Sequence, residues 1–368
     1  MNKYLTVIVF ILLSCSFEGN SSAQKEGSGI KGVFAYSDFE YELNLSGDVI
    51  ALDSLKLPLR IKVDGAKERM YITTASHSKW LQVYDIRSKK LINELVSKGQ
   101  GPGEMLNATD VQLSHSKNEL YIHDMIQKRI DVYDLEKTIG EKSLMPKNTI
   151  ELDSLQTYYP KIDRKGHVID LISSLSGNEE NRLYKLSLED AAIIKEGGFY
   201  PEIDYPQQSP QFKSQVFMAF MNTDPEAEYF ALAHAYTDYL ELYDSDFNLI
   251  SSARGPELFD PLLETKSVGG GGSMVAPLKD SRDAYTYPVL GNNMIYVLFD
   301  GKNTSEQGFH QDELFLFNYK LEPLIRFKLN IPIYAFDIDW EKNILYGLTL
   351  ESPEDGNEVA VVKYDLNK

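Results

Sequence analysis

The stretch that decides the fold is Leu81-Gln82-Val83-Tyr84-Asp85, in which two apolar side chains alternate with variable ones before an aspartate. The same pattern, apolar-x-apolar followed by Tyr or Phe and then Asp or Asn, returns along the chain about every 56 residues. Its other copies are Ile130–Asp134, Leu240–Asp244, Leu314–Asn318 and Val361–Asp365, with a degenerate copy at Leu183–Ser187. Alternation with period two is typical of a half-buried strand, so the repeat predicts one such strand in each of six units.

Each unit has room for three further strands around this one. An alternating segment precedes it, as in Met70–Ile72, and an outer segment follows it, as in Leu91–Val96. A further apolar segment, such as Val111–Leu113, begins the unit. Four short strands per repeat predict an all-β, six-bladed β-propeller with four-stranded blades. A β-sandwich and a seven-bladed ring are the competing interpretations, and the third unit has the weakest repeat.

The two ends of the chain bear on how such a ring closes. The sixth repeat stops at Asp365, three residues before the C-terminus, so the sixth unit lacks its outermost strand. Residues 33–45, VFAYSDFEYELNL, form a surplus strand candidate at the other end. We predict that this N-terminal strand completes the sixth blade and closes the ring by backbone hydrogen bonds, which removes an open sheet edge.

The first residues have the layout of a secretory signal rather than of a folded segment. Lys3 precedes an apolar run, Tyr4–Leu13, that is shorter than the roughly 20 residues a spanning helix needs. Leu12-Leu13-Ser14-Cys15 resembles the lipobox of bacterial lipoproteins, and that resemblance implies cleavage before Cys15 and lipid on its thiol. The alternative is an ordinary signal peptide in which the cysteine is incidental.

The expected domain organisation follows from these ends. Residues 1–14 are a signal peptide, and residues 15–32 comprise the lipidated Cys15 and a tether rich in Gly, Ser and charge. Residues 33–368 form the propeller. The expected location is the cell envelope, with the protein lipid-anchored to a membrane on its periplasmic side or at the cell surface.

Two loop motifs resemble a known family. Gly99-Gln100-Gly101-Pro102-Gly103-Glu104 follows the outer strand of the first unit, and Arg254-Gly255-Pro256-Glu257 follows that of the fourth. With the strand patterns around them, these loops resemble the TolB-like six-bladed propeller lipoproteins of Gram-negative bacteria. The resemblance implies the fold and the lipid anchor, and it implies little about a ligand because a fold does not determine a function.

A second, shorter resemblance concerns modification. Asp53-Ser54-Leu55 and Asp153-Ser154-Leu155 resemble the short O-glycosylation motif of some Gram-negative exported proteins. The sequence leaves open whether either site is used.

Composition argues against several classes of partner and site. The chain carries 37 Lys and Arg against 55 Asp and Glu, a net charge of −18. Nucleic acids and anionic lipid surfaces favour a surplus of basic residues, so neither is predicted as a partner. A single cysteine among 368 residues also argues against a disulfide framework and against a zinc site built on cysteine.

The sequence contains no motif that supplies a nucleophile, a cofactor cradle or a zinc pair. The loop that ends at Glu104 has glutamate where the dinucleotide fingerprint needs its third glycine, so we interpret it as a turn between blades. No two of the six histidines lie at zinc spacing. Asp337, Asp339 and Glu341 form an acidic cluster that we interpret as a solvated turn. No cofactor or metal is predicted, although separate blades can assemble a metal site.

Two hypotheses of function remain, and the first is favoured. It is a non-catalytic binding or scaffold protein, monomeric, that uses one propeller face for a protein, peptide or glycan partner. The alternative is a metal-dependent hydrolase or lyase acting on a sugar or lactone in the channel. The predicted binding face carries the long loops between blades and between second and third strands, which are typical places for recognition. The candidate contact residues on it are Gln100, Glu104, His123, Arg254, Glu257 and Tyr287.

Overall fold

The computed structural model describes most of the chain after its first 31 residues. The described ranges are 32–75, 78–114, 116–141, 143–152, 159–171, 181–187, 192–201, 210–268, 272–304, 311–350 and 359–367. The expected signal peptide, Cys15, most of the tether and Asp153-Ser154-Leu155 lie outside them. No helix among the described residues is long and apolar enough to cross a membrane.

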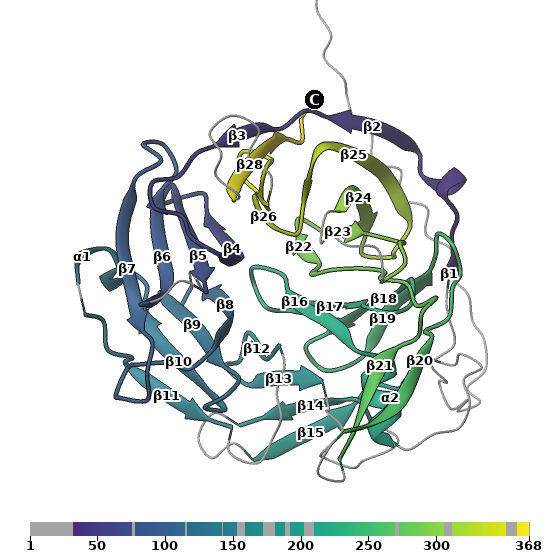
Figure 1. The fold of residues 1–368 in the computed structure, drawn as a ribbon, viewed down its shortest axis with the longest axis horizontal. Coiled ribbons are helices and arrows are strands. Elements are labelled where there is room, and N and C mark those ends of the chain that lie inside the picture. Colours follow the sequence, from purple (N-terminus) through teal and green to yellow (C-terminus); the bar gives the residue numbers. More distant parts are fainter. Residues whose placement is uncertain are drawn as a thin grey trace, which may run out of the picture.

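Six β-sheets stand side by side around a central channel, as the repeat predicts (Figure 1). In each sheet the first strand of the repeat lies innermost. The first blade contains β4 (Pro58–Asp64), β5 (Arg69–Thr74), β6 (Lys79–Asp85) and β7 (Leu91–Ser97). The second contains β8 (Ala108–Ser114), β9 (Glu119–Asp124), β10 (Arg129–Asp134) and β11 (Asn148–Glu151). The third contains β12 (Lys161–Ile162), β13 (Val168–Leu171), β14 (Leu183–Leu186) and β15 (Ile193–Gly197).

The other three blades take their inner strands from the second half of the chain. The fourth contains β16 (Ala219–Thr223), β17 (Tyr229–His234), β18 (Tyr239–Asp244) and β19 (Leu249–Arg254). The fifth contains β22 (Val289–Gly291), β23 (Met294–Phe299), β24 (Gln311–Asn318) and β25 (Pro323–Ile333). The sixth contains β26 (Ala335–Asp339), β27 (Ile344–Thr349) and β28 (Ala360–Asp365). The anchor repeats fall in the third strand of every blade, so the six-bladed, four-stranded prediction is confirmed.

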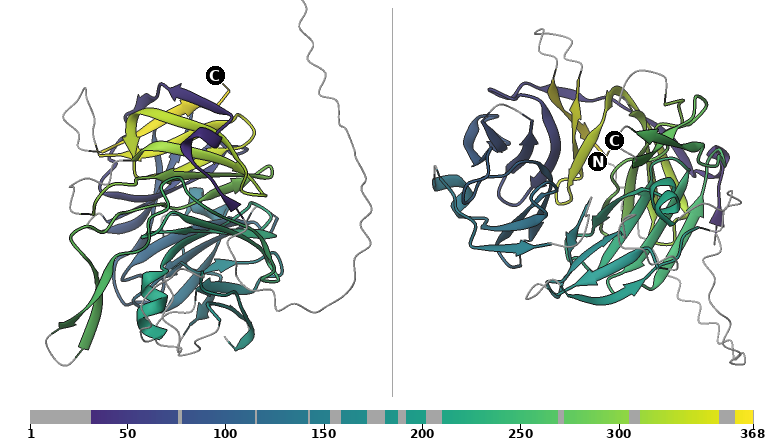
Figure 2. Two further views of the ribbon diagram at one scale, coloured as in Figure 1. Left: turned by 90° about the vertical axis from the view of Figure 1, so that its right-hand side faces the viewer. Right: turned by 60° about the horizontal axis from the view of Figure 1, so that its bottom comes forward.

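A few elements lie outside the blades. The helices are α1 (Lys137–Gly140) and α2 (Pro210–Val216). A hairpin of β20 (Leu263–Val268) and β21 (Gly272–Pro277) lies in the connection between the fourth and fifth blades and projects from the ring (Figure 2).

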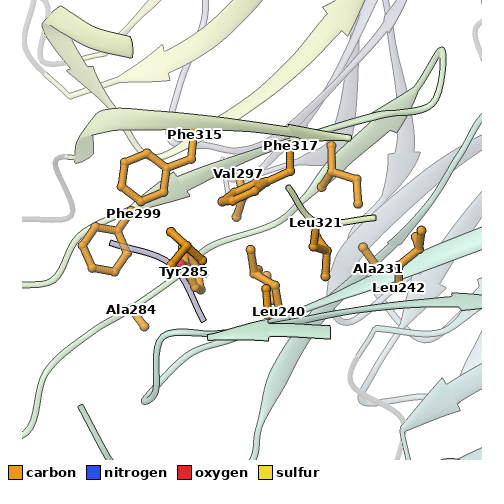
Figure 3. Packing of buried hydrophobic residues seen from close by; sticks show 14 of the residues in the cluster. Ala231, Leu240, Leu242, Ala284, Tyr285, Val297, Phe299, Phe315, Phe317 and Leu321 are labelled. Carbon is orange, nitrogen blue, oxygen red and sulfur yellow. The ribbon is translucent and has the colours of Figure 1, made fainter. Parts of the chain in front are cut away.

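The blades are held together by apolar side chains on both faces of each sheet. One cluster fills the space between the fourth and fifth blades (Figure 3). There Leu240 and Leu242 of β18 pack in one cluster with Phe315 and Phe317 of β24, and all four are almost fully buried. Because both faces of each strand are covered, β9 and β17 are buried over nearly their whole length, as expected of stacked sheets.

The N-terminal arm runs along the outside of three blades (Figure 1). Strand β1 (Gly32–Val33) pairs in parallel with β19, and β2 (Tyr41–Leu45) pairs in parallel with β25. The short helix η1 (Tyr36–Asp38) lies between them. Only then does β3 (Asp48–Ile50) pair antiparallel with β28 as the outermost strand of the sixth blade.

The prediction of closure by an N-terminal strand is therefore confirmed, but the residues predicted for it were wrong. Residues 33–45 add fifth strands to the fourth and fifth blades, and β3 closes the ring. The physical reason is that β19 and β25 each offer a free outer edge, which accepts a parallel strand. The three residues of β3 carry too little alternation to be recognised in the sequence.

Gly47 gives a specific test of this closure. A Cβ at Gly47 would lie 2.4 Å from a methyl group of Val362 and 2.6 Å from the ring of Tyr364, both on β28. We expect Gly47→Ala to lower the free energy of unfolding by about 1–3 kcal/mol, the usual cost of overpacking, because β3 must move away from β28. Urea denaturation measures the change.

The matched control is Gly140→Ala, since a Cβ at Gly140 meets nothing within 4 Å. This variant should leave the free energy of unfolding unchanged or raise it slightly, because alanine has a higher helix propensity than glycine and Gly140 lies in α1. Equal denaturation midpoints for the two variants would contradict closure through β3.

Candidate functional site: the central channel

The ring has two faces, which we name by the connections they carry. The link face carries the connections between blades and the loops between second and third strands. The turn face carries the turns between first and second strands. Within the described residues, the strand order places on the link face Gly99–Asn107, His123–Lys128, His234–Asp238 and the ranges 254–268, 272–284 and 300–304, which belong to the loops predicted for the binding face. Each inner strand runs through the channel from the link face to the turn face.

Aromatic side chains fill the channel at its link-face end. Tyr287, just before β22, has its ring centroid 4.6 Å from that of Phe220 and 5.1 Å from that of Tyr159, just before β12. The guanidinium carbon of Arg60 lies 3.8 Å from the Tyr287 centroid. Arg60 belongs to the first blade and Tyr287 precedes the inner strand of the fifth, so this contact crosses the channel. The link-face end is thus obstructed by a cation stacked on packed rings.

Buried ion pairs lie beside this obstruction. Lys161 of β12 pairs with Asp110 of β8, and both side chains are almost fully buried. Burial lowers the pKa of Lys161, and the Asp110 carboxylate opposes that shift. Lys62 of β4 lies 3.7 Å from Asp337 of β26. Burial raises the pKa of Asp337, while Lys62 and a backbone hydrogen bond oppose the rise. The middle of the channel is therefore polar, with its charges largely compensated.

Three inner-strand side chains connect neighbouring blades across the channel wall. Gln112 of β8 donates to the carbonyl of Ile162 at 2.9 Å and accepts from its N–H at 2.8 Å. Asn222 of β16 donates to the carbonyl of Pro288 at 2.9 Å. Asp337 accepts from the N–H of Val63 at 2.8 Å. These bonds join the second blade to the third, the fourth to the fifth and the sixth to the first.

The channel opens at the turn face into a cavity of about 400 Å³. Five of the six inner strands or the turns that follow them contribute to its wall, which combines polar, charged and apolar side chains. Trp340 lies across Gly291, where a Cβ would be 2.3 Å from the indole. We call this cavity the vestibule. A neighbouring cavity of about 130 Å³ shares Gln112, Leu113 and Pro225 with it.

The rim of the vestibule is acidic. Its charged lining residues are one lysine against four aspartates and a glutamate: Lys62, Asp64, Asp224, Asp337, Asp339 and Glu341. The rim aspartates also hold the turns. Asp339 accepts from the N–H groups of Glu341 and Lys342 at 3.2 Å, and Asp224 accepts from that of Tyr229 at 2.9 Å. These bonds are consistent with a turn at Asp339 and Glu341, but only Glu341 is exposed. Asp339 and Asp337 are buried, so the prediction that all three are solvated is wrong for these two.

Five of the six predicted contact residues make internal polar contacts on the link face or lie buried below it. Glu104 accepts from the N–H of Gly101 at 2.9 Å, so the glycine-rich loop is a turn held by its own glutamate. His123 is 3% exposed and Tyr287 9% exposed. Gln100 is exposed.

Arg254 and Glu257 meet through Asp238, which the sequence analysis did not single out. Arg254 lies 3.5 Å from Asp238 and 2.6 Å from Asp260. Asp238 also accepts from the backbone N–H of Glu257 at 2.8 Å. The Glu257 carboxylate accepts from the Tyr36 hydroxyl at 2.7 Å, which ties the N-terminal arm to this loop. The structure thus brings these two residues together, away from the buried pair of His123 and Tyr287, which both lie near Asp110.

A second buried polar network lies between the third and fourth blades. Arg182 donates to Glu241 at 2.5 Å, and His234 Nε2 lies 3.0 Å from the same carboxylate oxygen. The Tyr243 hydroxyl donates to the other oxygen at 2.8 Å. All these side chains are almost fully buried, so the network links the blades and has no open side for a ligand. Within the described ranges, no group of three or more His, Cys, Asp or Glu side chains could hold a metal ion.

Comparison with known proteins identifies the fold family. A family model described as "TolB-like 6-blade propeller-like" matches residues 38–341. No curated protein sequence matches. A putative exported protein of Bacteroides fragilis has a similar structure, with a TM-score of 0.55 at 11% identity over 90% of this chain and 98% of that one. A DUF4221 family member from Bacteroides vulgatus has a TM-score of 0.54 at 12% identity over 87% and 98%. These structural similarities support the fold alone.

The two buried histidines predict a loss of stability in acid. Burial lowers the pKa of His123 and of His234 from 6.5 to about 4. The unfolded chain therefore binds protons that the folded one does not, and stability falls as the pH falls from 6.5 toward 4. Each histidine contributes up to about 3 kcal/mol to this loss. Urea midpoints measured between pH 7.5 and 4.5 record it.

The double variant His123→Gln/His234→Gln should have a shallower dependence of its urea midpoint on pH. The control is His167→Gln, which should keep the pH dependence of the wild type. The His167 side chain is 30% exposed, so it is not buried as His123 and His234 are. The histidine explanation fails if the double variant and the wild type lose stability in parallel over this range.

Proposed function

The chain belongs to the TolB-like six-blade propeller-like family, and from that premise we propose that it is a non-catalytic binding protein of the cell envelope, anchored by lipid on Cys15. Its partner is a protein, peptide or glycan, and one propeller face holds a group of that partner. The observation that carries this proposal is the vestibule, a cavity of about 400 Å³ with a mixed polar, charged and apolar lining, open at one end of the channel. Pockets of this size take small ligands or single groups of larger ones. Among the described residues, no cluster of metal-binding side chains supports the alternative of a metal-dependent hydrolase or lyase.

The geometry favours the turn face over the link face as the place of the binding site. At the turn face, polar groups of several blades and the indole of Trp340 line one hollow. At the link face, the channel is filled by Tyr159, Phe220 and Tyr287. The loops of the link face remain the site predicted from the sequence, and Gln100 is exposed there. A comparison of variants on the two faces separates the two placements.

Charge reversal at the rim is the test of the turn face. Glu341 is exposed and lines the vestibule, so Glu341→Lys should fold normally while it changes the potential at the opening. We expect it to reduce at least tenfold the amount of the main partner captured from the native envelope. Quantitative mass spectrometry of material bound to the immobilised protein measures this capture.

Two control variants complete the comparison. Glu151→Lys makes the same charge change at an exposed position of β11, away from the vestibule, and should capture as the wild type does. Arg254→Ala removes a predicted contact of the link face and should have little effect. Capture that is lost in Arg254→Ala and kept in Glu341→Lys would place the site on the link face and defeat the proposal.

The lipid anchor is tested separately. The chain has one cysteine, directly after a ten-residue apolar run and a serine, so labelled palmitate should enter the wild type and not Cys15→Ala. The variant should also leave the membrane fraction. Labelling that persists in Cys15→Ala would show that the anchor is elsewhere or absent.

A further inference from the structure

Arg60 differs from Lys62 and Lys161 in having no carboxylate at ion-pair distance among the described residues, although Asp110 lines the same small cavity. Lys62 and Lys161 each pair with an aspartate. Arg60 donates to the carbonyl of its neighbour Leu59 and stacks on Tyr287, but it makes no ion pair with a carboxylate among the residues that the structure describes. Its Nε is buried and has no hydrogen-bond partner in the same part of the chain. A guanidinium remains charged at every physiological pH, so this charge calls for an anion.

The hydroxyl of Tyr287 is a second buried group of this kind. It too has no hydrogen-bond partner of good geometry within the described residues. The polar neighbours of this hydroxyl are Arg60 and Tyr159, and among the described residues neither the hydroxyl nor the guanidinium has a carboxylate at hydrogen-bond distance. Unsatisfied buried donors are costly. A carboxylate has two acceptor oxygens and fits the planar guanidinium, which makes it the matching group.

This donor pair can be approached from the vestibule. A small cavity of about 20 Å³ lies at Arg60 and Tyr287 and shares Lys62, Asn222 and Val289 with the vestibule lining. Beyond it the packed aromatic rings obstruct the channel. A chain therefore cannot thread past Arg60, and only an end group can reach it. This volume is little more than one water molecule needs, so the end group can be no larger than a carboxylate, and the residues next to it must extend back toward the rim.

The rim selects the residues next to that end group. Arg60 and Asp64 lie four residues apart on β4, which corresponds to roughly 13 Å along a strand. An extended peptide with its end at Arg60 thus passes the rim about four residues upstream. Asp339 already pairs with Lys342 at 3.3 Å, but the lining still holds more acidic than basic groups. It therefore favours basic side chains there and repels a polysaccharide that carries a carboxylate on every sugar.

We propose that the vestibule binds the C-terminus of a peptide, with its terminal carboxylate on Arg60 and Tyr287 and basic side chains at the rim four or five residues before the end. This inference rests on the proposed function, because it specifies the ligand of the same vestibule. It adds a chemical class and a direction of binding.

The test compares two labelled octapeptides on the purified mature protein by fluorescence anisotropy. Both have lysine at the fifth and sixth positions from the C-terminus and glycine, alanine and serine elsewhere, and they differ only in a free or an amidated C-terminus. We expect the free acid to bind at least tenfold more tightly. The amide carries more positive charge, so attraction to a protein of net charge −18 would give the opposite order.

Arg60→Gln should remove the difference between the two peptides. The substitution also removes the stack on Tyr287, so the melting temperature of each variant is measured alongside binding. The conservative variant Arg60→Lys keeps the charge but not the planar two-donor geometry, and it should retain part of the preference. Glu341→Lys should weaken both peptides alike and keep the preference for the free acid.

Three outcomes would overturn the inference. The first is equal binding of acid and amide that still depends on Glu341; it would leave the binding function of the vestibule intact. The second is Arg60-dependent binding of an oligoglucuronate with no binding of either peptide, which would make the ligand an acidic glycan. The third is no binding of any probe. The proposed function itself fails only if envelope capture is insensitive to Glu341→Lys, so the two failures are distinguishable.

Discussion

The innermost strand of every blade has one edge with no strand beside it, and the architecture of the channel follows from the need to satisfy that edge. Backbone N–H and carbonyl groups that are buried without partners are costly. In this propeller, polar side chains of one inner strand supply partners for the backbone of the next blade, as Gln112 does for Ile162 and Asp337 for Val63. Hydrogen bonds of this kind join alternate pairs of blades, while apolar clusters fill the space between the sheets farther out.

This solution brings charge into the middle of the molecule. Once amides and carboxylates line the channel, lysines from neighbouring strands can be buried beside them, as the pairs Lys62–Asp337 and Lys161–Asp110 show. The aromatic rings at one end then make the two ends unequal. The link-face end is closed because aromatic residues lie at or just before the start of the inner strands, and the turn-face end is open because the vestibule lies where these strands end. A recognition site in the vestibule would therefore use side chains that the fold already needs for its own stability.

Much of the fold could be predicted because each blade repeats one alternating strand, and the anchor strands all fall where the repeat places them. Closure by an N-terminal strand was predicted correctly, but it was assigned to the wrong residues. The closing strand β3 has only three residues and almost no alternation of apolar and polar side chains, whereas the longer segment 33–45 has more. The face of the long loops also followed from strand order alone.

The site was harder to predict, because its residues contact one another across the ring from distant parts of the sequence. Arg60 and Tyr287 stack although more than two hundred residues separate them, and no local pattern records such a contact. One signal was present and was not used: Gln112, Asn222 and Asp337 are each a polar residue inside an inner strand, next to apolar ones. A polar residue at this repeated position indicates a channel wall. By contrast, Arg254 and Glu257 were predicted as free contact residues. Their partner Asp238 lies on another loop, so the sequence around them does not show that they contact it.

The order in which the N-terminal arm meets the blades has a mechanical consequence. Starting from its N-terminal end, the arm first pairs with the fourth blade, then with the fifth, and reaches the closing strand last. A pulling force on that end is therefore borne by β1 and then by the five paired positions of β2 before it reaches β3. The side chain of Phe34, packed against Phe39 and Phe317, adds resistance at the first of these steps. If the protein is held by its N-terminus, a pulling force would first separate β1 and β2 from the outer edges of the fourth and fifth blades. The ring would stay closed during these steps, because β3 would still pair with β28.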